Sequence, residues 1–364
     1  AGLSWVTPAW GVEALIYPGG SIKDDLRTAI QEHSKGVPKK TIYTHTGWNK
    51  IGQNDAYLHG NGAISKDGND PNVTVEMPTE LRHYALPDPP NPFQAVKAIR
   101  QSFSLLRLGP IEILWPMLAA TYRSAIDAAD FSLHLAGRTG TYKSEVASLF
   151  QSHFGEAMDS RHLPASWSST ANALEALCFR TKNCIVVIDD YIPTGTSWQL
   201  QQMAKTADQI IRGQGNQAGR SRLSDTAKLK QTYYPRGLVL STGEDTPTGH
   251  SVRARMLILE MDVDAVDLSI LTKCQNNRQL LSQAMAGFIH WLSQDLVKHR
   301  QHLLATRNKA RDRHIKIGHS RTPPILGDMI ATIMLLLEYA KEINALTTDQ
   351  CNSLYNNCLL YTSD

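Results

Sequence analysis

Cysteine is scarce in this sequence, and no two cysteines have the spacing of a zinc or disulfide motif. The five cysteines include no CxxC pair, and the thirteen histidines form no HExxH pattern. Zinc sites need such closely spaced ligands, and small disulfide-stabilised folds need many cysteines. Both classes are therefore excluded, and free thiols in a reducing cytosol are expected.

The sequence also lacks a strong net charge and a long apolar segment. It has 37 lysines and arginines against 34 aspartates and glutamates, a net charge of +3. No general attraction to a polyanion follows, so a nucleic-acid site must be a local patch. The longest apolar run, residues 329–337, falls short of the roughly 20 residues that a membrane-spanning helix needs. It predicts a core helix and no membrane contact.

Composition changes along the chain and predicts three regions followed by a short tail. Residues 1–88 combine alternating segments such as TIYTH with turn clusters such as GNDPN, which predicts a small β-rich domain. The proline-rich run 86–92 marks a linker, because proline neither continues a helix nor fits a central strand. Residues 89–270 alternate between strands and helices, and residues 271–357 are helical throughout. The end, 358–364, resembles translated adapter sequence and is expected to be a non-native tail.

The middle region has the pattern of a parallel sheet covered by helices. Asn91 and Pro92 are typical of a helix cap and first turn. Strands are predicted at 131–136, 166–169, 184–189, 237–242 and 255–261, and helices after residues 91, 110, 143, 171 and 198. Because strands alternate with helices, we expect an α/β fold with helices on both faces of a parallel sheet.

The segment GRTGTYKS, residues 137–144, follows a predicted strand and opens a predicted helix. It nearly matches GxxxxGK[ST], in which loop N–H groups cradle phosphates, the lysine reaches the terminal phosphates and the hydroxyl meets magnesium. The matching positions are Gly137, Arg138, Thr139, Gly140, Thr141, Lys143 and Ser144. Tyr142 stands where glycine is expected, so the loop either avoids positive φ there or tolerates it at a cost. A strand, turn and helix with a solvated lysine is the alternative.

A second motif, CIVVIDDY, is a buried strand that ends in Asp189 and Asp190. In P-loop ATPases the first such acid holds magnesium and the second polarises the attacking water. Alone, acids at a strand end are common and would be explained by a surface turn. Together with the phosphate loop, in an alternating chain, they predict an ATPase that uses ATP and magnesium.

Two further segments offer residues that complete such a site. The strand RGLVLSTGED, which we expect between the two motif strands, ends in the polar residues Ser241, Thr242 and Glu244. A polar residue there can orient the attacking water, and Ser241 or Thr242 is the candidate; an ordinary polar strand end is the alternative. Arg253 and Arg255 precede the next strand and can reach a neighbouring subunit's γ-phosphate. Surface ion pairs would account for the same two arginines.

Five segments, in their order along the chain, resemble the DUF927 family of helicase-like P-loop ATPases. They are GRTGTYKS, SWSSTANALE, CIVVIDDY, PRGLVLSTGE and SVRAR. That family occurs in mobile elements, phages and plasmids and includes MCM-like replicative helicases of the AAA+ class. The resemblance covers roughly residues 40–295, beginning with a β-rich segment that contains GWNKIGQNDAYLHGNGAI. SWSSTANALE is its most family-specific part.

The resemblance implies an AAA+-like P-loop NTPase fold and an ATP-driven DNA motor. It implies a homo-hexameric helicase subunit that acts on single-stranded or forked DNA in a prokaryotic or viral cytoplasm. Position by position, it assigns phosphate and magnesium to Lys143 and Ser144, magnesium to Asp189, the general base to Asp190, the sensor to Thr242 or Ser241, and the finger to Arg255 or Arg253. The usual second acid is glutamate, so the shorter Asp190 predicts slower hydrolysis or a slightly shifted register, and an effect on rate rather than on binding.

Two segments offer local positive charge for DNA. Residues 210–225 contain Arg212, Arg220 and Arg222 in a glycine-rich stretch, and residues 297–321 form the strongest basic cluster of the chain. A flexible surface loop and a solvated helix face are the respective alternatives. Two other functions also remain open: an ATPase that remodels or loads nucleic acid or protein, and a nucleotide-binding interaction module with little turnover.

Overall fold

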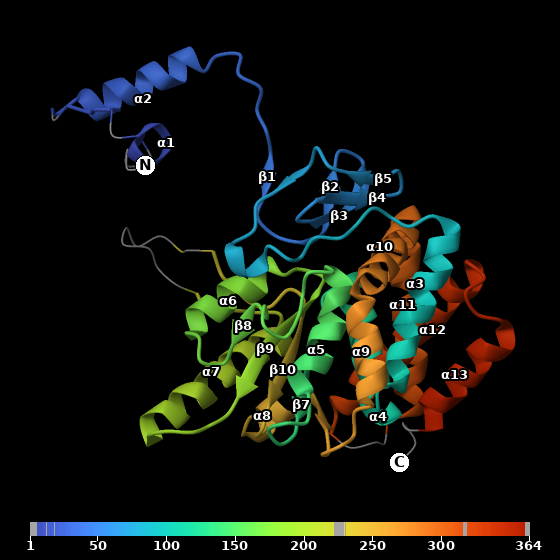
Figure 1. Ribbon diagram of the computed structural model, residues 1–364. Coiled ribbons are helices and arrows are strands. Elements are labelled where there is room, and N and C mark those ends of the chain that lie inside the picture. The colour runs from blue at the N-terminus through green and yellow to red at the C-terminus, as the bar shows by residue number, and fades with distance from the viewer. Residues whose placement is uncertain are drawn as a thin grey trace. The chain divides into compact units, whose positions relative to one another are not determined.

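The structure, a computed structural model, describes residues 6–11, 13–17, 19–221, 229, 231–315 and 319–360, without the side chains of 7 and 358–360. The chain divides into two compact units, Ala1–Thr41 and Ile42–Asp364. Figure 1 shows the elements of both units by their labels.

The first unit is helical, which differs from the β-rich domain predicted over residues 1–88. It contains α1 (Val6–Trp10) and α2 (Ile22–His33). Asp24 and Asp25 stand in the first turn of α2 and His33 in its last turn, which favours the helix dipole. None of the α2 side chains is buried. Strand-type alternation begins only after Thr41, so the β-rich part is shorter than expected.

The β-rich part of the second unit is built from short paired strands. An antiparallel meander contains β2 (Gly47–Ile51), β3 (Asn54–His59), β4 (Gly62–Ser65) and β5 (Gly68–Asp70). Beside it, β1 (Ile42–Tyr43) pairs in parallel with β6 (Thr74–Val75), and the 3-10 helix η1 (Thr79–Leu81) follows. These strands confirm a β-rich N-terminal part that begins after the first unit.

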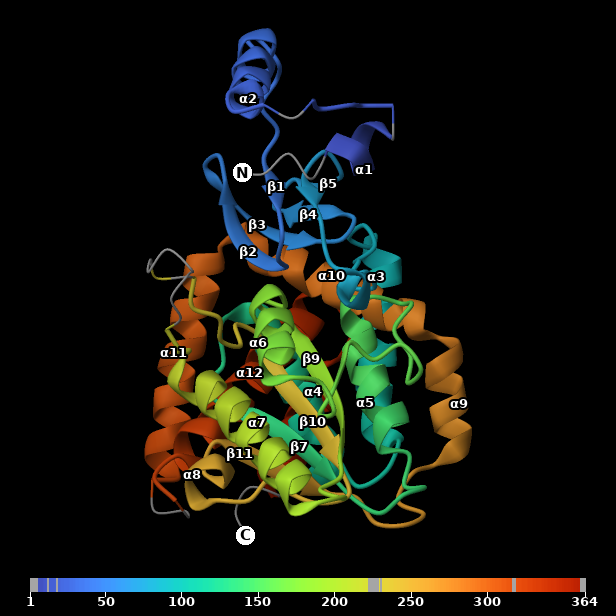
Figure 2. The same ribbon diagram turned by 90° about the vertical axis from the view of Figure 1, so that its left-hand side faces the viewer.

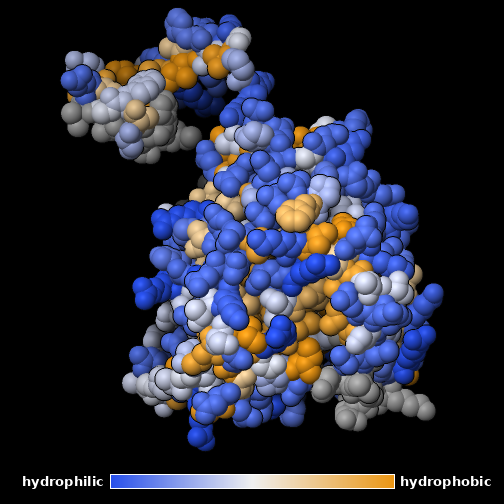
Figure 3. All heavy atoms as spheres, turned by 45° about the vertical axis from the view of Figure 1, so that its right-hand side comes forward, coloured by the Kyte–Doolittle hydropathy of each residue, from blue (hydrophilic) through white to orange (hydrophobic). Residues whose placement is uncertain are grey.

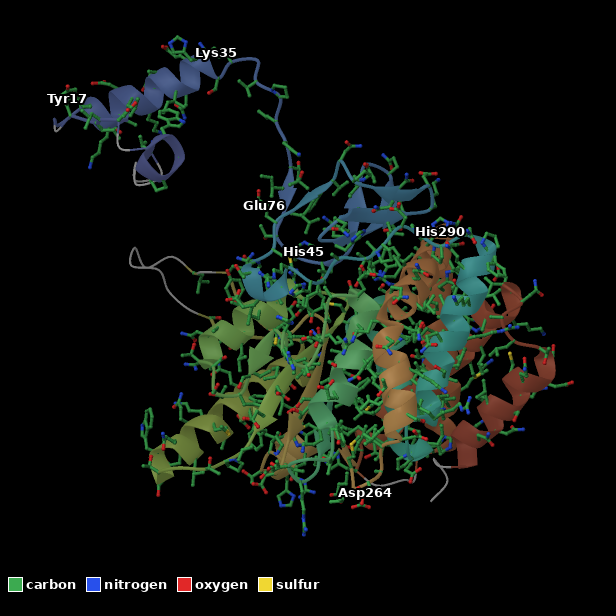
Figure 4. The ribbon with its side chains drawn as sticks, in the orientation of Figure 1. Tyr17, Lys35, His45, Glu76, Asp264 and His290 are labelled. Atoms are coloured by element: carbon green, nitrogen blue, oxygen red, sulfur yellow. The ribbon has the colours of Figure 1, made fainter. Side chains whose placement is uncertain are left out.

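The meander is joined to the rest of the unit by buried aromatic side chains. The Tyr57 hydroxyl donates to the Asn183 carbonyl at 2.5 Å, and the Tyr84 hydroxyl donates to the Ile185 carbonyl at 2.9 Å. On the helical side, His290 lies 2.9 Å from the Ser65 carbonyl, and Figure 4 labels this histidine and His45 along the seam. Each buried tyrosine hydroxyl therefore has a hydrogen-bond partner, as buried polar groups need. These bonds connect the meander and the segment after it to the start of β9.

The core of the second unit is a five-stranded parallel sheet, as predicted. Its order is β11-β7-β10-β9-β8, with every pair parallel. The strands are β7 (Ser132–Ala136), β8 (Ala165–Ser166), β9 (Ile185–Tyr191), β10 (Leu238–Gly243) and β11 (Met256–Glu260). The strand of the phosphate loop, β7, and the strand of the paired acids, β9, therefore flank β10.

Helices cover both faces of this sheet, because β9, β10 and β11 direct alternate apolar side chains into two different hydrophobic clusters. The helices α4 (Ile111–Ile126) and α5 (Lys143–Gln151) pack with one cluster. The helices α6 (Ala171–Arg180) and α7 (Ser197–Asn216) pack with the other, and Figure 2 shows them in front of the strands. The connecting elements are η2 (Leu105–Arg107), η3 (Ser152–Phe154) and α8 (His250–Arg253).

The remaining helices form a helical layer beside the sheet. They are α3 (Pro92–Ser104), α9 (Leu268–Asn276), α10 (Arg278–Gln294), α11 (Leu296–Arg313), α12 (Thr322–Glu342) and α13 (Thr348–Leu360). The Asn91 side chain accepts a hydrogen bond from Gln94 N at 3.0 Å, which is the predicted cap of α3. By length and composition α12 could cross a membrane, but 78% of its most apolar window is buried, as in a core helix.

The surface over the helical layer is mixed. Seen from the side of α3, α9 and α13, hydrophobic side chains interrupt a largely hydrophilic surface (Figure 3). Phe93, at the start of α3, is 82% exposed. The four cysteines whose side chains are described, Cys178, Cys184, Cys274 and Cys351, are free.

Candidate active site at the carboxyl end of the sheet

The predicted phosphate loop connects β7 to α5 and needs glycine at two of its positions. A Cβ atom on Gly137 would lie 2.5 Å from the Met261 carbonyl oxygen, so a side chain there would collide with backbone. Gly140 has a φ of +89°, a conformation that side chains disfavour. The two glycines let the backbone turn from the strand into the helix whose N-terminus faces the cleft.

Tyr142 adopts the left-handed conformation in which the sequence pattern expects glycine. Its φ is 61° and its ψ 21°, directly before the first residue of α5. The loop thus follows the second of the two predicted alternatives and accepts positive φ at a bulky residue. The side chain is 45% exposed and lines the cleft.

Lys143 folds back over the loop that precedes it. Its Nζ donates to the Arg138 carbonyl at 2.8 Å and to the Thr141 hydroxyl at 3.3 Å. Burial lowers the pKa of this ammonium, while Glu244, then Asp189 and Asp190, raise it. A phosphate in the loop would offer stronger acceptors than these two neutral oxygens.

The first acid, Asp189, connects three elements at the carboxyl end of the sheet. Its Oδ1 accepts a hydrogen bond from the Ser144 hydroxyl of α5 at 2.8 Å. The same oxygen accepts a hydrogen bond from the Thr242 hydroxyl of β10. The phosphate-loop helix, the acid strand and the strand between the two motif strands therefore meet at one carboxylate.

The second acid, Asp190, lies in a β-bulge. Two residue steps along β10, from Ser241 to Gly243, face three along β9, from Ile188 to Tyr191. Asp190 has a φ of 69°, and its N–H donates to the Thr242 hydroxyl at 3.2 Å. Burial, and then the charges of Asp189 and Glu244, raise the pKa of its carboxyl, while Lys143 lowers it. Bulges beside active sites commonly re-aim a side chain, and here the side chain is exposed to the cleft.

The two sensor candidates point in different directions. Thr242 contacts Asp189 and lines the cleft. Ser241 is buried on the other face of the sheet, where its hydroxyl lies 2.8 Å from His134 Nδ1 and accepts from Trp167 Nε1 at 2.8 Å. Burial lowers the pKa of His134 to about 4, so this imidazole is neutral near pH 7.

Most of the predicted residues share one cleft of about 360 Å³. Its predicted lining residues are Thr139, Gly140, Tyr142, Lys143, Ser144, Asp189, Asp190 and Thr242. Gly137, Arg138 and Thr141 belong to the loop but do not line the cleft. Glu145, Ile192 and Gly243 also line it without having been predicted, and so does Glu244, which the sequence offered only as one of the polar residues at its strand end. The signal for Glu244 is its position two residues after Thr242, since residues two apart share a face of a strand.

The donor set at the Asp189 end suits magnesium. Within the described residues, no group of three or more His, Cys, Asp or Glu side chains could hold a metal ion. Magnesium is usually held by one or two protein carboxylates, with water and substrate phosphates completing an octahedron. The Asp189 carboxylate and the Ser144 hydroxyl, 2.8 Å apart, are hard oxygen ligands of this kind.

The two predicted finger arginines lie at the amino end of the edge strand β11, whereas the cleft lies at the carboxyl ends of the strands. Arg253 ends α8, and Arg255 directly precedes β11, which runs parallel to β7. Arg255 donates to the Ser251 hydroxyl at 2.7 Å and to Asn216 Oδ1 at 2.9 Å. Burial, with the nearby Arg321 and Arg212, lowers the pKa of its guanidinium. Neither arginine lines the cleft of its own chain.

The predicted DNA segments are partly engaged inside the chain. Arg212 pairs with Asp208 at 2.6 Å, and Arg220 donates to Gln209 at 3.2 Å, whereas Arg222 lies outside the described residues. In the basic segment 297–321, Arg307 lies 2.9 Å from the fully buried Asp328. Lys298, Lys309 and Arg313 of that segment are exposed, and Lys316 lies outside the described residues.

The fold is similar to that of a solved helicase. The SCCmec type IV Cch active helicase matches 94% of this chain with a TM-score of 0.57 and 13% identity. This chain spans 62% of that protein's length. Because identity is low, the likeness establishes the fold alone.

Two other solved structures match at a lower level. An inhibitor-bound JCV helicase covers 64% of this chain with a TM-score of 0.30 and 11% identity, and 67% of its own chain is matched. The NrS-1 C-terminal region covers 92% of this chain with a TM-score of 0.32 and 12% identity, and 77% of its own chain is matched. These scores are too low to add to the fold assignment.

The family assignment comes from the sequence itself. None of the curated proteins is significantly similar to this chain in sequence. The model of a domain of unknown function, DUF927, matches residues 18–232, which is more than half of the chain. This confirms the resemblance seen in the motifs, and the chain belongs to the DUF927 family.

Proposed function

We propose that this chain is a subunit of an ATP-hydrolysing DNA motor, a helicase. One observation carries the proposal: the Asp189 carboxylate accepts hydrogen bonds from Ser144 at the start of α5 and from Thr242 on β10. In this proposal, Ser144 belongs to the loop that would bind phosphate, Asp189 would hold magnesium and Thr242 is the polar strand tip, and all three line one cleft. That arrangement suits the γ-phosphate of a nucleoside triphosphate.

Phosphate binding would use the loop and Lys143. The N-terminus of α5 directs N–H groups and the positive end of a helix dipole toward the cleft. Lys143 would exchange the Arg138 carbonyl and Thr141 hydroxyl for phosphate oxygens. The gain comes from a charge-assisted bond that replaces a bond to a neutral acceptor.

Ser144 and Asp189 would hold magnesium. When bound, the ion supplies charge neutralisation for the phosphates and the leaving group. Before that, the Ser144 hydroxyl donates to Asp189, which keeps the carboxylate oriented. Thr242 fixes the same carboxylate from the neighbouring strand.

Hydrolysis would use Asp190 as the proton acceptor. Water forms a bond to the γ-phosphorus, the bond from that phosphorus to the bridging oxygen breaks, and the water proton passes to the carboxylate. The raised pKa of Asp190 makes it a stronger base than an ordinary aspartate. The Thr242 hydroxyl accepts a hydrogen bond from the backbone N–H of Asp190, and so it helps to position the base.

A ring of subunits would complete the site. Arg253 and Arg255 lie at the amino end of β11, and the cleft lies at the carboxyl ends of the strands, so these arginines would act on the nucleotide of another copy. An arginine supplied in this way stabilises transition-state charge. DNA would be held by exposed cations of residues 210–221 and α11 through phosphate contacts.

The test is ATP hydrolysis by the chain in the presence of magnesium, with and without single-stranded DNA. We expect turnover that DNA stimulates and that Lys143→Ala abolishes. Lys97→Ala, an exposed lysine of α3, is the matched control and should behave as the unchanged chain.

A second candidate function is a nucleotide-binding module with little turnover. The left-handed Tyr142 and the short Asp190 favour this function, because ATPases of this kind usually have glycine at the first position and glutamate at the second. Binding of a triphosphate by a folded chain, with no hydrolysis under any DNA condition, would put this function ahead of the motor.

A further inference from the structure

The carboxylate of Glu244 holds the phosphate loop in this structure. Glu244 follows the last residue of β10, and its side chain is exposed in the cleft. The Thr139 hydroxyl, in the middle of the loop, donates to Glu244 Oε1. The residues 139 and 244 come from the ends of adjacent strands, so this bond bridges the mouth of the cleft.

The cleft has two ends with different chemistry. Ser144, Asp189 and Thr242 form the magnesium end, where the Ser144 and Thr242 hydroxyls both donate to the Asp189 carboxylate. Lys143, Thr139 and Glu244 form the other end. Glu244 is the carboxylate that most raises the pKa of Lys143, which places its charge close to the ammonium that reaches terminal phosphates.

A γ-phosphate and the Glu244 carboxylate would compete for the same partners. Both are anionic, and both would use the Lys143 ammonium and the donors of the loop. The cleft is already rich in negative charge, since the described residues that line it include Glu145, Asp189, Asp190 and Glu244 against one cation, Lys143. Like charges at close range repel, so the carboxylate must leave when a third phosphate enters.

We propose that Glu244 is a latch on the phosphate loop, closed in the free chain or with a nucleoside diphosphate and opened by the third phosphate of a triphosphate. A diphosphate ends one phosphate short and leaves the Thr139–Glu244 bond intact. Glu244 thereby sets how strongly the site distinguishes triphosphate from diphosphate. The proposal rests on the proposed function of the cleft as a nucleotide site.

The experiment compares nucleotide binding by the full chain and by Glu244→Gln. Affinity for ADP and for a non-hydrolysable ATP analogue is measured by calorimetry in magnesium buffer. Glutamine keeps an oxygen that can accept from Thr139 but removes the charge. We expect triphosphate affinity to rise about tenfold, the size of a charged contact exchanged at a partly exposed site, with little change for ADP.

Two further variants make the result specific. Glu260→Gln removes the same charge from the exposed end of β11, which is separated from β10 by β7, and should bind both nucleotides as the unchanged chain does. Thr139→Val removes the hydroxyl donor of the latch and should also favour the triphosphate. If Thr139→Val shows no gain in triphosphate affinity, the effect of Glu244→Gln comes from the removed charge alone, and the latch proposal is wrong.

The outcomes separate this proposal from the function on which it rests. If the unchanged chain binds neither nucleotide, both proposals fail together. The cleft is a nucleotide site without a latch if three results are found together. The unchanged chain binds both nucleotides, and Lys143→Ala abolishes this binding. In addition, Glu244→Gln either binds as the unchanged chain does or gains the same affinity for both nucleotides.

Discussion

At the scale of single residues, the two hydroxyls at the end of β10 have separate tasks. The Thr242 hydroxyl donates a hydrogen bond to Asp189 on one face of the sheet. On the other face, the Ser241 hydroxyl accepts a hydrogen bond from Trp167 Nε1 and contacts His134. The sequence could only offer both as sensors, because adjacent residues of a strand differ in face and the pattern does not say which face carries the site.

Thr242→Val should lower kcat, because valine keeps the shape of the side chain but loses the donor to Asp189. We expect a fall of about tenfold or more, with nucleotide affinity changed by less than about threefold. Ser241→Ala should keep kcat per folded molecule but lower the free energy of unfolding by about 1–3 kcal/mol, since it leaves buried Trp167 Nε1 unpaired. Steady-state kinetics and urea unfolding measure the two effects. The reverse pattern would make Ser241 the sensor.

Tyr142 stores backbone strain that smaller residues would release. A left-handed conformation costs an L-residue roughly 1–2 kcal/mol, whereas glycine and asparagine adopt it readily. Urea unfolding should therefore rank Tyr142→Gly and Tyr142→Asn at or above the unchanged chain, and Tyr142→Val below it. A stable valine variant would show that the loop does not hold positive φ in solution. ADP binding by Tyr142→Gly at unchanged affinity would show that the ring is not needed for the cradle.

The residue-scale prediction was strongest where the chemistry is local. Lys143, Ser144 and Asp189 follow from motif spacing, and the structure brings them to one cleft. The hydrogen bond of Glu244 to the loop joins residues about a hundred positions apart. No local pattern reports such a contact.

At the scale of elements, the sequence predicted the parallel sheet and the place of β10 between the two motif strands, and both are confirmed. Alternating apolar strands and helices leave few arrangements, because crossovers between parallel strands have a fixed hand. The β-bulge at Asp190 and the two helices before residue 42 were not predicted. The first depends on strand register, and the second was hidden by a composition rich in turn-forming residues.

The element α11 is held by a buried ion cluster, not by amphipathic packing alone. Asp328 of α12 is fully buried and receives Arg123 of α4 at 2.7 Å and Arg307 of α11 at 2.9 Å. Arg307 therefore belongs to the interior contacts of the unit, although it lies in the basic segment that suggested DNA binding. The DNA contacts of α11 would have to come from its exposed cations.

Asp328→Asn should destabilise the unit, because it leaves two arginines at the site without the opposing charge. We expect a loss of about 3–5 kcal/mol in the free energy of unfolding, typical of one partner removed from a buried pair. Asp312→Asn, on the exposed side of α11 beside Arg311, should change it by less than about 1 kcal/mol. Equal, small effects of both variants would mean that the cluster does not tie the three helices together.

At the scale of the whole molecule, the two ends of the strands of the second unit carry different charge. The carboxyl end carries the acidic cleft, and the amino end of β11 carries Arg255 beside Arg321 and Arg212. Surfaces of opposite charge at opposite ends favour head-to-tail contacts between copies, and such contacts close into rings or continue as filaments. The sequence could name the residues but not their separation, which follows from the parallel pairing of β11 with β7.

This separation predicts that two inactive variants restore each other. Lys143→Ala keeps the arginine and loses the cradle, and Arg255→Ala keeps the cradle and loses the arginine, so neither should hydrolyse ATP alone. In an equal mixture about a quarter of the head-to-tail contacts join an intact cradle to an intact arginine, so about a quarter of the unchanged activity should return. Arg255→Ala activity equal to that of the unchanged chain would remove the arginine from the mechanism. Failure of the mixture to recover, with assembly confirmed by light scattering, would instead place the action of Arg255 within its own chain.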